Sequence, residues 1–144
     1  MNIRIIESIN ELLEVIIKCP KTNETVLKLK EHIEMFDDKL RASDGEKIFL
    51  IDPLEALYFE SVDNRTFLYT ENNVLEVRHR LYELEETLSR KDFIRISKSQ
   101  ILNINKIKSL KPELNRSITA TMINGEILCI SRRYAQALKT LLRI

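Results

Sequence analysis

Three groups of polar side chains interrupt the apolar, β-prone runs of this 144-residue sequence. They are Ser61–Thr66, Ser97–Gln100 and Ser131–Arg133. Arg and Lys can bind the O6 and N7 atoms of guanine, Asn can pair with adenine, and Ser or Thr hydroxyls can hold phosphate groups. Side chains of these types at three strand ends are compatible with recognition of DNA. Loops are also polar simply because water surrounds them, so the residue types alone leave both interpretations open.

The charges of the chain are unevenly distributed, although the net charge is only +1. Residues 93–144 hold 10 basic and 2 acidic residues, whereas residues 43–92 hold 6 and 12 and residues 1–42 hold 7 and 8. A C-terminal third with a net charge of +8 favours a nucleic acid or another acidic partner. The alternative is that the acidic and basic parts face each other within the fold.

The sequence contains no recognisable pattern of catalytic or metal-binding residues. The two histidines, His32 and His79, have no metal-binding spacing, and two glycines are too few for a Gly-rich phosphate loop. Cys19 and Cys129 lie far apart among aliphatic residues, which favours small buried side chains over a zinc site. We therefore expect a protein that is not an enzyme and that uses no metal, no cofactor and no small-molecule substrate.

The N-terminal sequence does not indicate export or membrane insertion. No apolar run approaches the ~20 residues that a membrane helix needs. Acidic residues at positions 7, 11 and 14 interrupt the apolar region that a signal peptide would require. We expect a cytoplasmic protein.

Residues 1–42 are expected to form an N-terminal extension of two strands and a helix. The stretches NIRIIES and LLEVIIKC are rich in Ile and Val, as strands are. Apolar residues then recur at intervals of three and four, which is the spacing of one helical face. This stripe can cover the sheet of its own chain or pair with a second copy. It consists of Val26, Leu29, Ile33, Phe36 and Leu40.

The remainder of the chain is expected to be rich in short strands. The polar segment 41–47 is the best candidate for a linker before it. Helices are expected at residues 80–90, where Leu81, Leu84 and Leu88 share one face, and after Ser131, which can cap a helix. Asn124-Gly125 between two β-compatible runs predicts a hairpin with a type I′ turn. The expected fold class is mainly β with marginal helices (α+β).

Three longer motifs of this part occur in a fixed order, DPLEALYFESVDNRTFLYT, DFIRISKSQILNINKIKSL and NGEILCISRRYAQALKTLL. They resemble the LytTR family of bacterial DNA-binding domains over about residues 44–144. The resemblance implies an elongated multi-sheet β fold whose loops, rather than a recognition helix, enter the major grooves of duplex DNA. We therefore expect two parts, a β-β-helix extension at residues 1–42 and a LytTR-like DNA-binding domain at residues 43–144.

The resemblance also implies, by position, which residues contact DNA. One set follows the opening strands, a second surrounds the Ser of the middle motif, and a third belongs to the SR motif near the C-terminus. Ser97 stands where many family members have His. The residues implied are Asn64, Arg65, Thr66, Ser97, Lys98, Ser99, Arg132 and Arg133.

Individual roles follow from the chemistry of these side chains. Arg132 is expected to bind a base edge, Lys98 a base edge or a phosphate, and Ser99 a phosphate. Asn103, which matches the motif Asn, is expected to be a buried structural partner and not a base contact. Neutralising charges are expected from Arg133, Lys106 and Lys108.

The main hypothesis is a sequence-specific, DNA-binding transcriptional regulator of a bacterium. The alternative is a protein-interaction module that binds an acidic partner without recognising DNA. The whole chain further resembles small stand-alone family members without a receiver domain. Regulation is therefore expected through residues 1–42, by formation of a homodimer or by a membrane-protein inhibitor.

Overall fold

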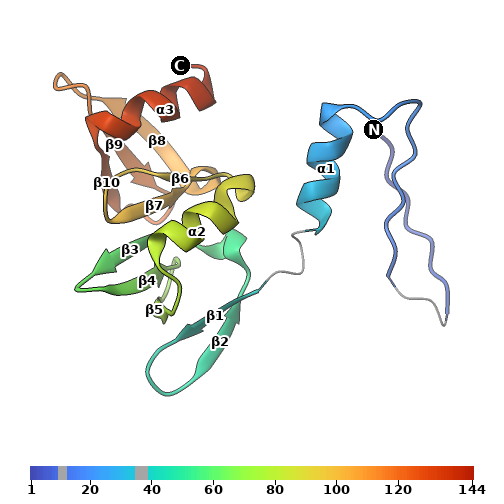
Figure 1. Cartoon of the computed structure of the whole chain (residues 1–144), viewed down its shortest axis with the longest axis horizontal. Coiled ribbons are helices and arrows are strands. Elements are labelled where there is room, and N and C mark those ends of the chain that lie inside the picture. The colour runs from blue at the N-terminus through green and yellow to red at the C-terminus, as the bar shows by residue number, and fades with distance from the viewer. Residues whose placement is uncertain (10–12, 35–38) are drawn as a thin grey trace.

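The computed structural model describes residues 1–9, 13–34 and 39–144. In these ranges the protein consists of two β-sheets with α-helices at their margins (Figure 1), which confirms the mainly β fold class. The helices are α1 (Glu24–Glu34), α2 (Leu81–Leu88) and α3 (Arg132–Leu142). The strands are β1 (Leu40–Ser43), β2 (Ile48–Ile51), β3 (Tyr58–Val62), β4 (Arg65–Tyr69), β5 (Val74–Val77), β6 (Phe93–Arg95), β7 (Gln100–Asn103), β8 (Ile107–Pro112), β9 (Ile118–Met122) and β10 (Ile127–Ile130).

The larger sheet is antiparallel and has the strand order β2-β1-β5-β4-β3-β7-β6, and the smaller sheet has the order β10-β9-β8. Strand β7 pairs with β3 in the register Phe59↔Ile101, which joins the middle of the chain to its basic third. Successive side chains of a strand point to opposite faces. Tyr58 and Phe59 therefore enter two different cores, one on each face of the larger sheet.

The first core lies between the larger sheet and α2. Leu81, Leu84 and Leu88 are all buried there, together with Phe59 and Leu68 of the sheet. The intervals of three and four between the leucines place them on one face of α2, as the sequence predicted. Burial of this face fixes α2 across the sheet.

The second core lies between the opposite face of the larger sheet, the smaller sheet and α3. It is formed by Ile96 and Leu102 from the larger sheet, Met122 and Ile130 from the smaller sheet, and Leu138 from α3. The smaller sheet and α3 are thereby attached to the β6 and β7 side of the larger sheet.

One hairpin turn differs in type from the sequence-based prediction. The hairpin predicted around Asn124-Gly125 is present and joins β9 to β10, but of the two only Gly125 has a positive φ (90°). The amide of Gly125 donates to the Met122 carbonyl and the amide of Met122 to the Glu126 carbonyl, an arrangement with one left-handed residue. The two-residue turn with positive φ at both central positions is instead Asp63–Asn64, at 51° and 62°, between β3 and β4.

The segment predicted to be a linker is a β-hairpin. Residues 41–47 contain most of β1 and the turn to β2, in which Gly45 takes a φ of 101°. Leu40 and Ala42 are buried in the first core. Leu40 therefore belongs to a strand and not to the predicted helix, which the structure describes over Glu24–Glu34. The apolar spacing that fits a helix at this point also supplies the inward positions of a strand. Phe36 of the predicted stripe lies outside the described residues.

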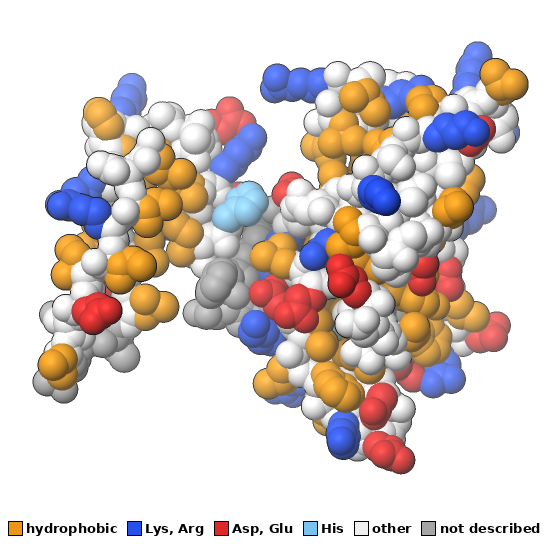
Figure 2. Space-filling model, turned by 180° about the vertical axis from the view of Figure 1, so that it is seen from behind, with side chains coloured by type: hydrophobic (Ala, Val, Ile, Leu, Met, Phe, Trp, Pro, Cys, Tyr) orange, Lys and Arg blue, Asp and Glu red, His pale blue; other side chains and the backbone are white. Residues whose placement is uncertain are grey.

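The structure assigns no strand to residues 1–9 and 13–22, where the sequence predicted two. Figure 2 shows hydrophobic side chains gathered on the surface of this part of the molecule. Two strands without a further sheet partner have marginal stability. The cysteines also differ from expectation, since Cys19 and Cys129 are both exposed.

Candidate nucleic-acid interface

The three polar groups identified in the sequence meet at one end of the larger sheet. Residues Ser97–Gln100, here called the corner, lie in the middle. The amide of Ser61 donates a 2.8 Å hydrogen bond to the Ser99 carbonyl, which places the β3–β4 turn beside the corner. The amide of Ser131 donates a 3.0 Å bond to the Ile96 carbonyl, which places the start of α3 beside it as well.

The corner is a turn between two buried isoleucines. Ile96 and Ile101 are fully buried on either side of it, and the amide of Ile96 donates to the Gln100 carbonyl at 3.0 Å. The Ser97 hydroxyl accepts a 3.2 Å bond from the Ser99 amide and lies 3.4 Å from the Ser99 hydroxyl. The Lys98 side chain is exposed. The four polar residues Ser97–Gln100 therefore form a hydrogen-bonded turn from which the Lys98 side chain extends into solvent.

Gln100 connects the corner to β3. Its side-chain amide donates a 2.6 Å hydrogen bond to the Glu60 carboxylate, which also accepts a 3.4 Å bond from the Tyr69 hydroxyl. Burial and Glu60 together raise the pKa of Tyr69 above its usual value, so the hydroxyl keeps its proton and remains a donor. Gln100 thus contributes to the position of the corner.

The β3–β4 turn presents Asn64, while its two neighbours are engaged within the protein. The Arg65 guanidinium forms a two-point contact with Glu76 of β5, with Nε 3.2 Å from Oε1, and lies over the Phe67 ring at 5.3 Å. This hydrogen-bonded contact lowers the pKa of Glu76 and raises that of Arg65. Thr66 is only 4% exposed, so the structure does not bring its side chain to the surface.

The third group lies at the start of α3. The Ser131 carbonyl accepts hydrogen bonds from the amides of Tyr134 and Ala135 at 2.9 Å, whereas its hydroxyl forms no capping bond. Arg132 and Arg133 are exposed in the first turn, and the Arg133 guanidinium lies 5.5 Å above the Tyr134 ring. The positive end of the helix dipole and two arginines therefore occur at the same place, which favours an anion.

Asn103 has the structural role predicted for it. Its side chain is 1% exposed and donates hydrogen bonds to the carbonyls of Ala56, at 2.8 Å, and Leu54, at 3.4 Å. Its carbonyl oxygen accepts a 3.0 Å bond from the Asn105 amide. Asn103 therefore connects the end of β7 to the segment that precedes β3.

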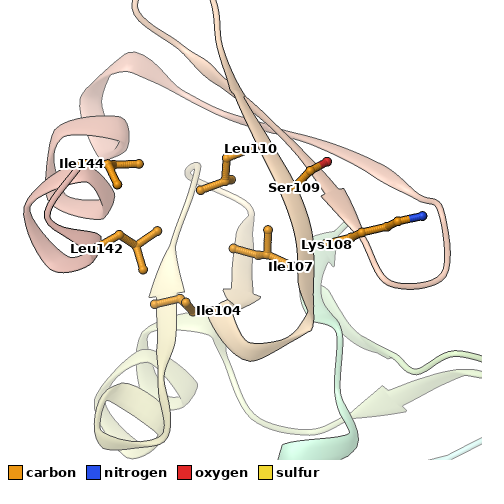
Figure 3. A pocket seen from close by; sticks show the side chains of 7 residues that line it. All are labelled: Ile104, Ile107, Lys108, Ser109, Leu110, Leu142 and Ile144. Carbon is orange, nitrogen blue, oxygen red and sulfur yellow. The ribbon is translucent and has the colours of Figure 1, made fainter.

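The structure does not bring Lys106 to this end of the sheet. Lys106 lines a hollow with Glu55 and the β4–β5 turn at residues 70–73. The register of the sheet places that turn at the opposite end from the β3–β4 turn. Lys108 lies on β8 beside an apolar groove that β8 forms with the end of α3 (Figure 3). The groove is lined mainly by Ile104, Ile107, Leu110, Leu142 and Ile144, and no Asp, Glu, His or Cys side chain lines it.

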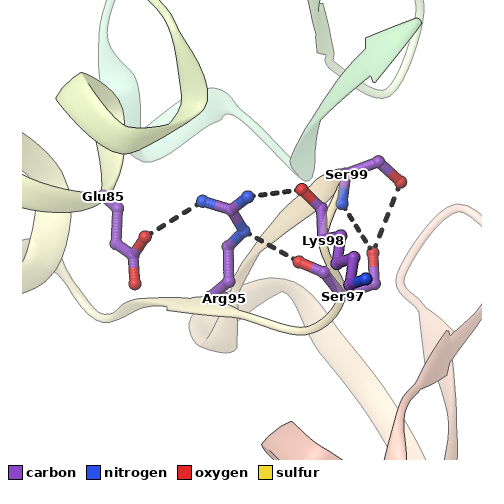
Figure 4. A network of polar contacts seen from close by, with 5 residues as sticks. All are labelled: Glu85, Arg95, Ser97, Lys98 and Ser99. Carbon is purple, nitrogen blue, oxygen red and sulfur yellow. Dashed lines mark hydrogen bonds and ion pairs between the residues drawn. The ribbon is translucent and has the colours of Figure 1, made fainter.

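The structure adds one residue that the sequence analysis missed. Arg95 precedes the corner and donates hydrogen bonds to the carbonyls of Ser97 and Lys98 and to the Glu85 carboxylate (Figure 4). Its position at the end of a strand resembles that of an ordinary surface arginine. Only the arrangement of α2 over the sheet reveals its partners.

The described residues offer neither a metal site nor a membrane-spanning helix. Residues 1–9, 13–34 and 39–144 contain no group of three His, Cys, Asp or Glu side chains that could hold a metal ion. In the same ranges no helix has the length and apolar character needed to cross a membrane.

Comparisons with known proteins agree with the fold. A family model described as LytTr DNA-binding domain matches residues 46–143. A solved LytTr DNA-binding domain from Bacillus cereus superimposes with a TM-score of 0.70 at 26% identity, covering 74% of this chain and 99% of that one.

Two curated relatives match most of this chain. The sensory transduction protein LytT of Bacillus subtilis is 30% identical over 88% of this chain and 53% of its own length, so the chain spans about half of that relative. A relative from Staphylococcus aureus, named an uncharacterized HTH-type transcriptional regulator, is 31% identical over 89% of this chain and 88% of its own length.

Proposed function

Because the chain belongs to the family of LytTr DNA-binding domains, we propose that it is a sequence-specific transcriptional regulator that acts on duplex DNA in the bacterial cytoplasm. The single observation that carries this proposal is the convergence of three polar segments at one end of the larger sheet. Residues from β3–β4, the corner and α3 lie far apart in the sequence, yet two main-chain hydrogen bonds hold them side by side. No enzymatic activity is part of the proposal.

The exposed side chains at this end have the chemistry that DNA contacts require. We assign Arg132 to a base edge, since a guanidinium can donate two parallel bonds to guanine. Lys98 is assigned to a base edge or a phosphate, and Arg133 to a phosphate near the helix N-terminus. We assign Asn64, which is exposed at the tip of the β3–β4 turn, to a neighbouring groove. Ser97 and Ser99 supply hydroxyls at the corner itself.

Two of the residues implied by the resemblance, Thr66 and Arg65, are not assigned to direct contacts with DNA. Thr66 is buried and acts through the shape of the β3–β4 turn. Arg65 is paired with Glu76, so its use by DNA requires a phosphate to compete with that carboxylate. The interface therefore centres on the corner and α3.

We further propose that the regulator is a homodimer assembled through residues 1–42. Seven aliphatic side chains of the extension are 57–90% exposed, namely Ile3, Ile5, Ile6, Ile9, Leu13, Val15 and Ile16. Together they expose on the order of 700 Å² of apolar surface, close to the ~800 Å² that each partner contributes to a standard interface. A second copy offers the same apolar surface, and the two extensions can complete each other's strand pairing.

The same division assigns separate tasks to the two parts of the chain. Residues 1–42 provide dimerisation, except that Leu40 and Ala42 belong to the core of the DNA-binding part. A membrane-protein inhibitor, the remaining partner implied by the resemblance, would act by covering the extension and so preventing dimer formation. Addition of the isolated inhibitor would then lower both the dimer fraction and the affinity for DNA.

An in-vitro selection tests the proposed function. Purified protein is incubated with a library of random duplexes at moderate salt, and the retained DNA is sequenced. Enrichment of short half-sites spaced about one helical turn apart is expected from a dimer with two equivalent DNA-contacting ends. Retention without enrichment would show binding by charge alone, and no retention at low salt would contradict the proposal.

A further inference from the structure

Arg95 connects three separate points around the corner. It is the last residue of β6, and its side chain is 18% exposed. Its Nε donates a 2.8 Å hydrogen bond to the Ser97 carbonyl, Nη2 donates to the Lys98 carbonyl, and Nη1 lies 3.0 Å from Oε2 of Glu85 on α2 (Figure 4). One guanidinium therefore holds two successive peptide groups of the corner and joins them to a helix.

These bonds determine the direction in which the corner points its carbonyl groups. The carbonyls of Ser97 and Lys98 face Arg95, and the next carbonyl, of Ser99, accepts a bond from the Ser61 amide. Three consecutive carbonyl oxygens are thus bonded within the protein. Carbonyl oxygens carry partial negative charge and would repel a phosphate group. Turning all three inward leaves an outer side that an anion can approach.

The guanidinium of Arg95 is already paired with groups of the protein itself. Glu85 pairs with it from the side of α2, and the two carbonyls take up further N–H groups. A guanidinium in this position offers little to a phosphate, because its donors already have partners. Arg95 thus differs from Arg132 and Arg133, which are exposed.

We propose that Arg95, supported by Glu85, is a positioning residue that orients Lys98 and Ser99 toward DNA without contacting DNA itself. This inference rests on the proposed function. Arg95 would then contribute to sequence specificity indirectly, because it fixes the direction of the Ser97 and Lys98 carbonyls. A planar fork with several donors is required for this task, and a lysine ammonium cannot reproduce it although it keeps the charge.

The test compares Arg95→Lys with the wild-type chain and with Arg143→Lys, a matched control at an exposed arginine after α3. Affinity is measured for the duplex that the wild-type chain selects and for a scrambled duplex, each over a range of salt concentrations. Arg95→Lys is expected to weaken binding to the selected duplex about tenfold or more, in line with the loss of charge-assisted hydrogen bonds. The affinity of Arg95→Lys for scrambled DNA and its slope of affinity against salt should stay unchanged. Arg143→Lys should match the wild-type chain in its affinity for both duplexes and in this slope.

In a charge-removing variant, Arg95→Gln, a slope reduced by about 0.9 would instead make Arg95 a phosphate contact. Wild-type selectivity in Arg95→Lys would overturn the inference. A further variant, Glu85→Gln, keeps the arginine and covers the case in which Arg95→Lys does not fold. It is expected to reduce selectivity in the same direction, and unchanged selectivity would count against the proposal. Failure of the wild-type chain to prefer any duplex would contradict the proposed function. In that case, amide exchange at Lys98 and Ser99 would still be expected to be faster in Arg95→Lys, and equal exchange would contradict the positioning role.

Discussion

The amide of Ser131 donates a 3.0 Å hydrogen bond to the carbonyl of Ile96, and this bond joins the start of the last helix to the corner. Both residues anchor to the second core, because Ile96 is fully buried and Ile130, which precedes Ser131, is buried with it. Arg132 follows Ser131 directly, and Lys98 follows Ile96 by two positions. The two cations assigned to DNA therefore take their relative positions from the packing of the second core.

Replacement of Arg132 should weaken specific DNA binding without unfolding the protein. Arg132→Ala is expected to reduce affinity for the selected duplex by about 5- to 150-fold, the loss of one two-point base contact worth ~1–3 kcal/mol. The side chain is exposed, so the melting temperature should change little. Lys47→Ala removes an exposed charge from the β1–β2 turn and serves as the control. An equal loss of melting temperature and affinity in Arg132→Ala would mark a structural residue instead.

The affinity for DNA should fall steeply as salt is added. Each phosphate that the protein neutralises adds about 0.9 to the slope of log affinity against log salt concentration. Lys98→Ala and Arg133→Ala are each expected to reduce this slope by about one such step if they meet phosphates. Titrations of a labelled duplex at several salt concentrations measure it. A flat plot for the wild-type chain would argue against phosphate contacts altogether.

The pair Arg65–Glu76 should respond to pH. The hydrogen bonds from Arg65 hold the pKa of Glu76 below its usual value, so the folded carboxylate stays charged to lower pH than the unfolded one. The contribution of this pair to stability is therefore fully present above the unfolded pKa and is lost as the pH falls through the lowered pKa. A Glu76→Gln variant imitates the neutral form at neutral pH.

Glu76→Gln is expected to bind DNA more tightly than the wild-type chain and with a steeper dependence on salt, because it releases Arg65 for a phosphate. Duplex titrations at neutral pH measure both properties. Asp44→Asn, which removes a carboxylate from the distant β1–β2 turn, is the control for the change in net charge. If both variants gain affinity equally, the effect comes from net charge and not from Arg65.

Asn103 should contribute to stability and not to DNA contact. Asn103→Ala leaves the buried carbonyl of Ala56 and the part-buried carbonyl of Leu54 without their donor, which costs about 1–3 kcal/mol in the free energy of unfolding. Urea denaturation measures this loss. Under conditions where the variant remains folded, its affinity for the selected duplex should match that of the wild-type chain, and a selective loss of affinity would give Asn103 a role at the interface.

The N-terminal extension should control the oligomeric state. A double variant, Ile5→Asp with Ile16→Asp, places charges on the exposed apolar surface and is expected to convert the dimer into a monomer in sedimentation experiments. Ile48→Asp introduces a charge at another exposed isoleucine, on β2, and should leave the dimer intact. A wild-type chain that sediments as a monomer, or a double variant that remains a dimer, would contradict the proposed role of residues 1–42.

Local patterns in the sequence were sufficient for much of the fold. The leucines of α2 are spaced for one helical face, and the isoleucines that flank Ser97–Gln100 define a turn between buried positions. Both patterns depend only on neighbouring residues. The β9–β10 hairpin was also predictable from neighbouring residues. Its turn type was not, because Asn124 does not take the positive φ that the Asn-Gly pair suggested.

Features that depend on distant partners could not be predicted in this way. Leu40 fits a helical stripe and an inward strand position equally well, and only its pairing with Ile51 distinguishes the two. The carboxylates that pair with Arg65 and Arg95 lie on β5 and α2, which are distant in the sequence. The sequence therefore did not reveal that these two arginines are paired. The residue types of the interface were visible, whereas the division between contacting and positioning residues required the structure.

The most direct test of the proposed DNA-contacting end is backbone NMR of the full chain with and without the duplex that it selects. We predict that chemical-shift changes concentrate at the β3–β4 turn, the corner and the first turn of α3. Residues of the β1–β2 turn, at the other end of the sheet, should remain unchanged. Shift changes centred on the β1–β2 turn, or spread evenly over the basic C-terminal third, would contradict the assignment of one DNA-contacting end.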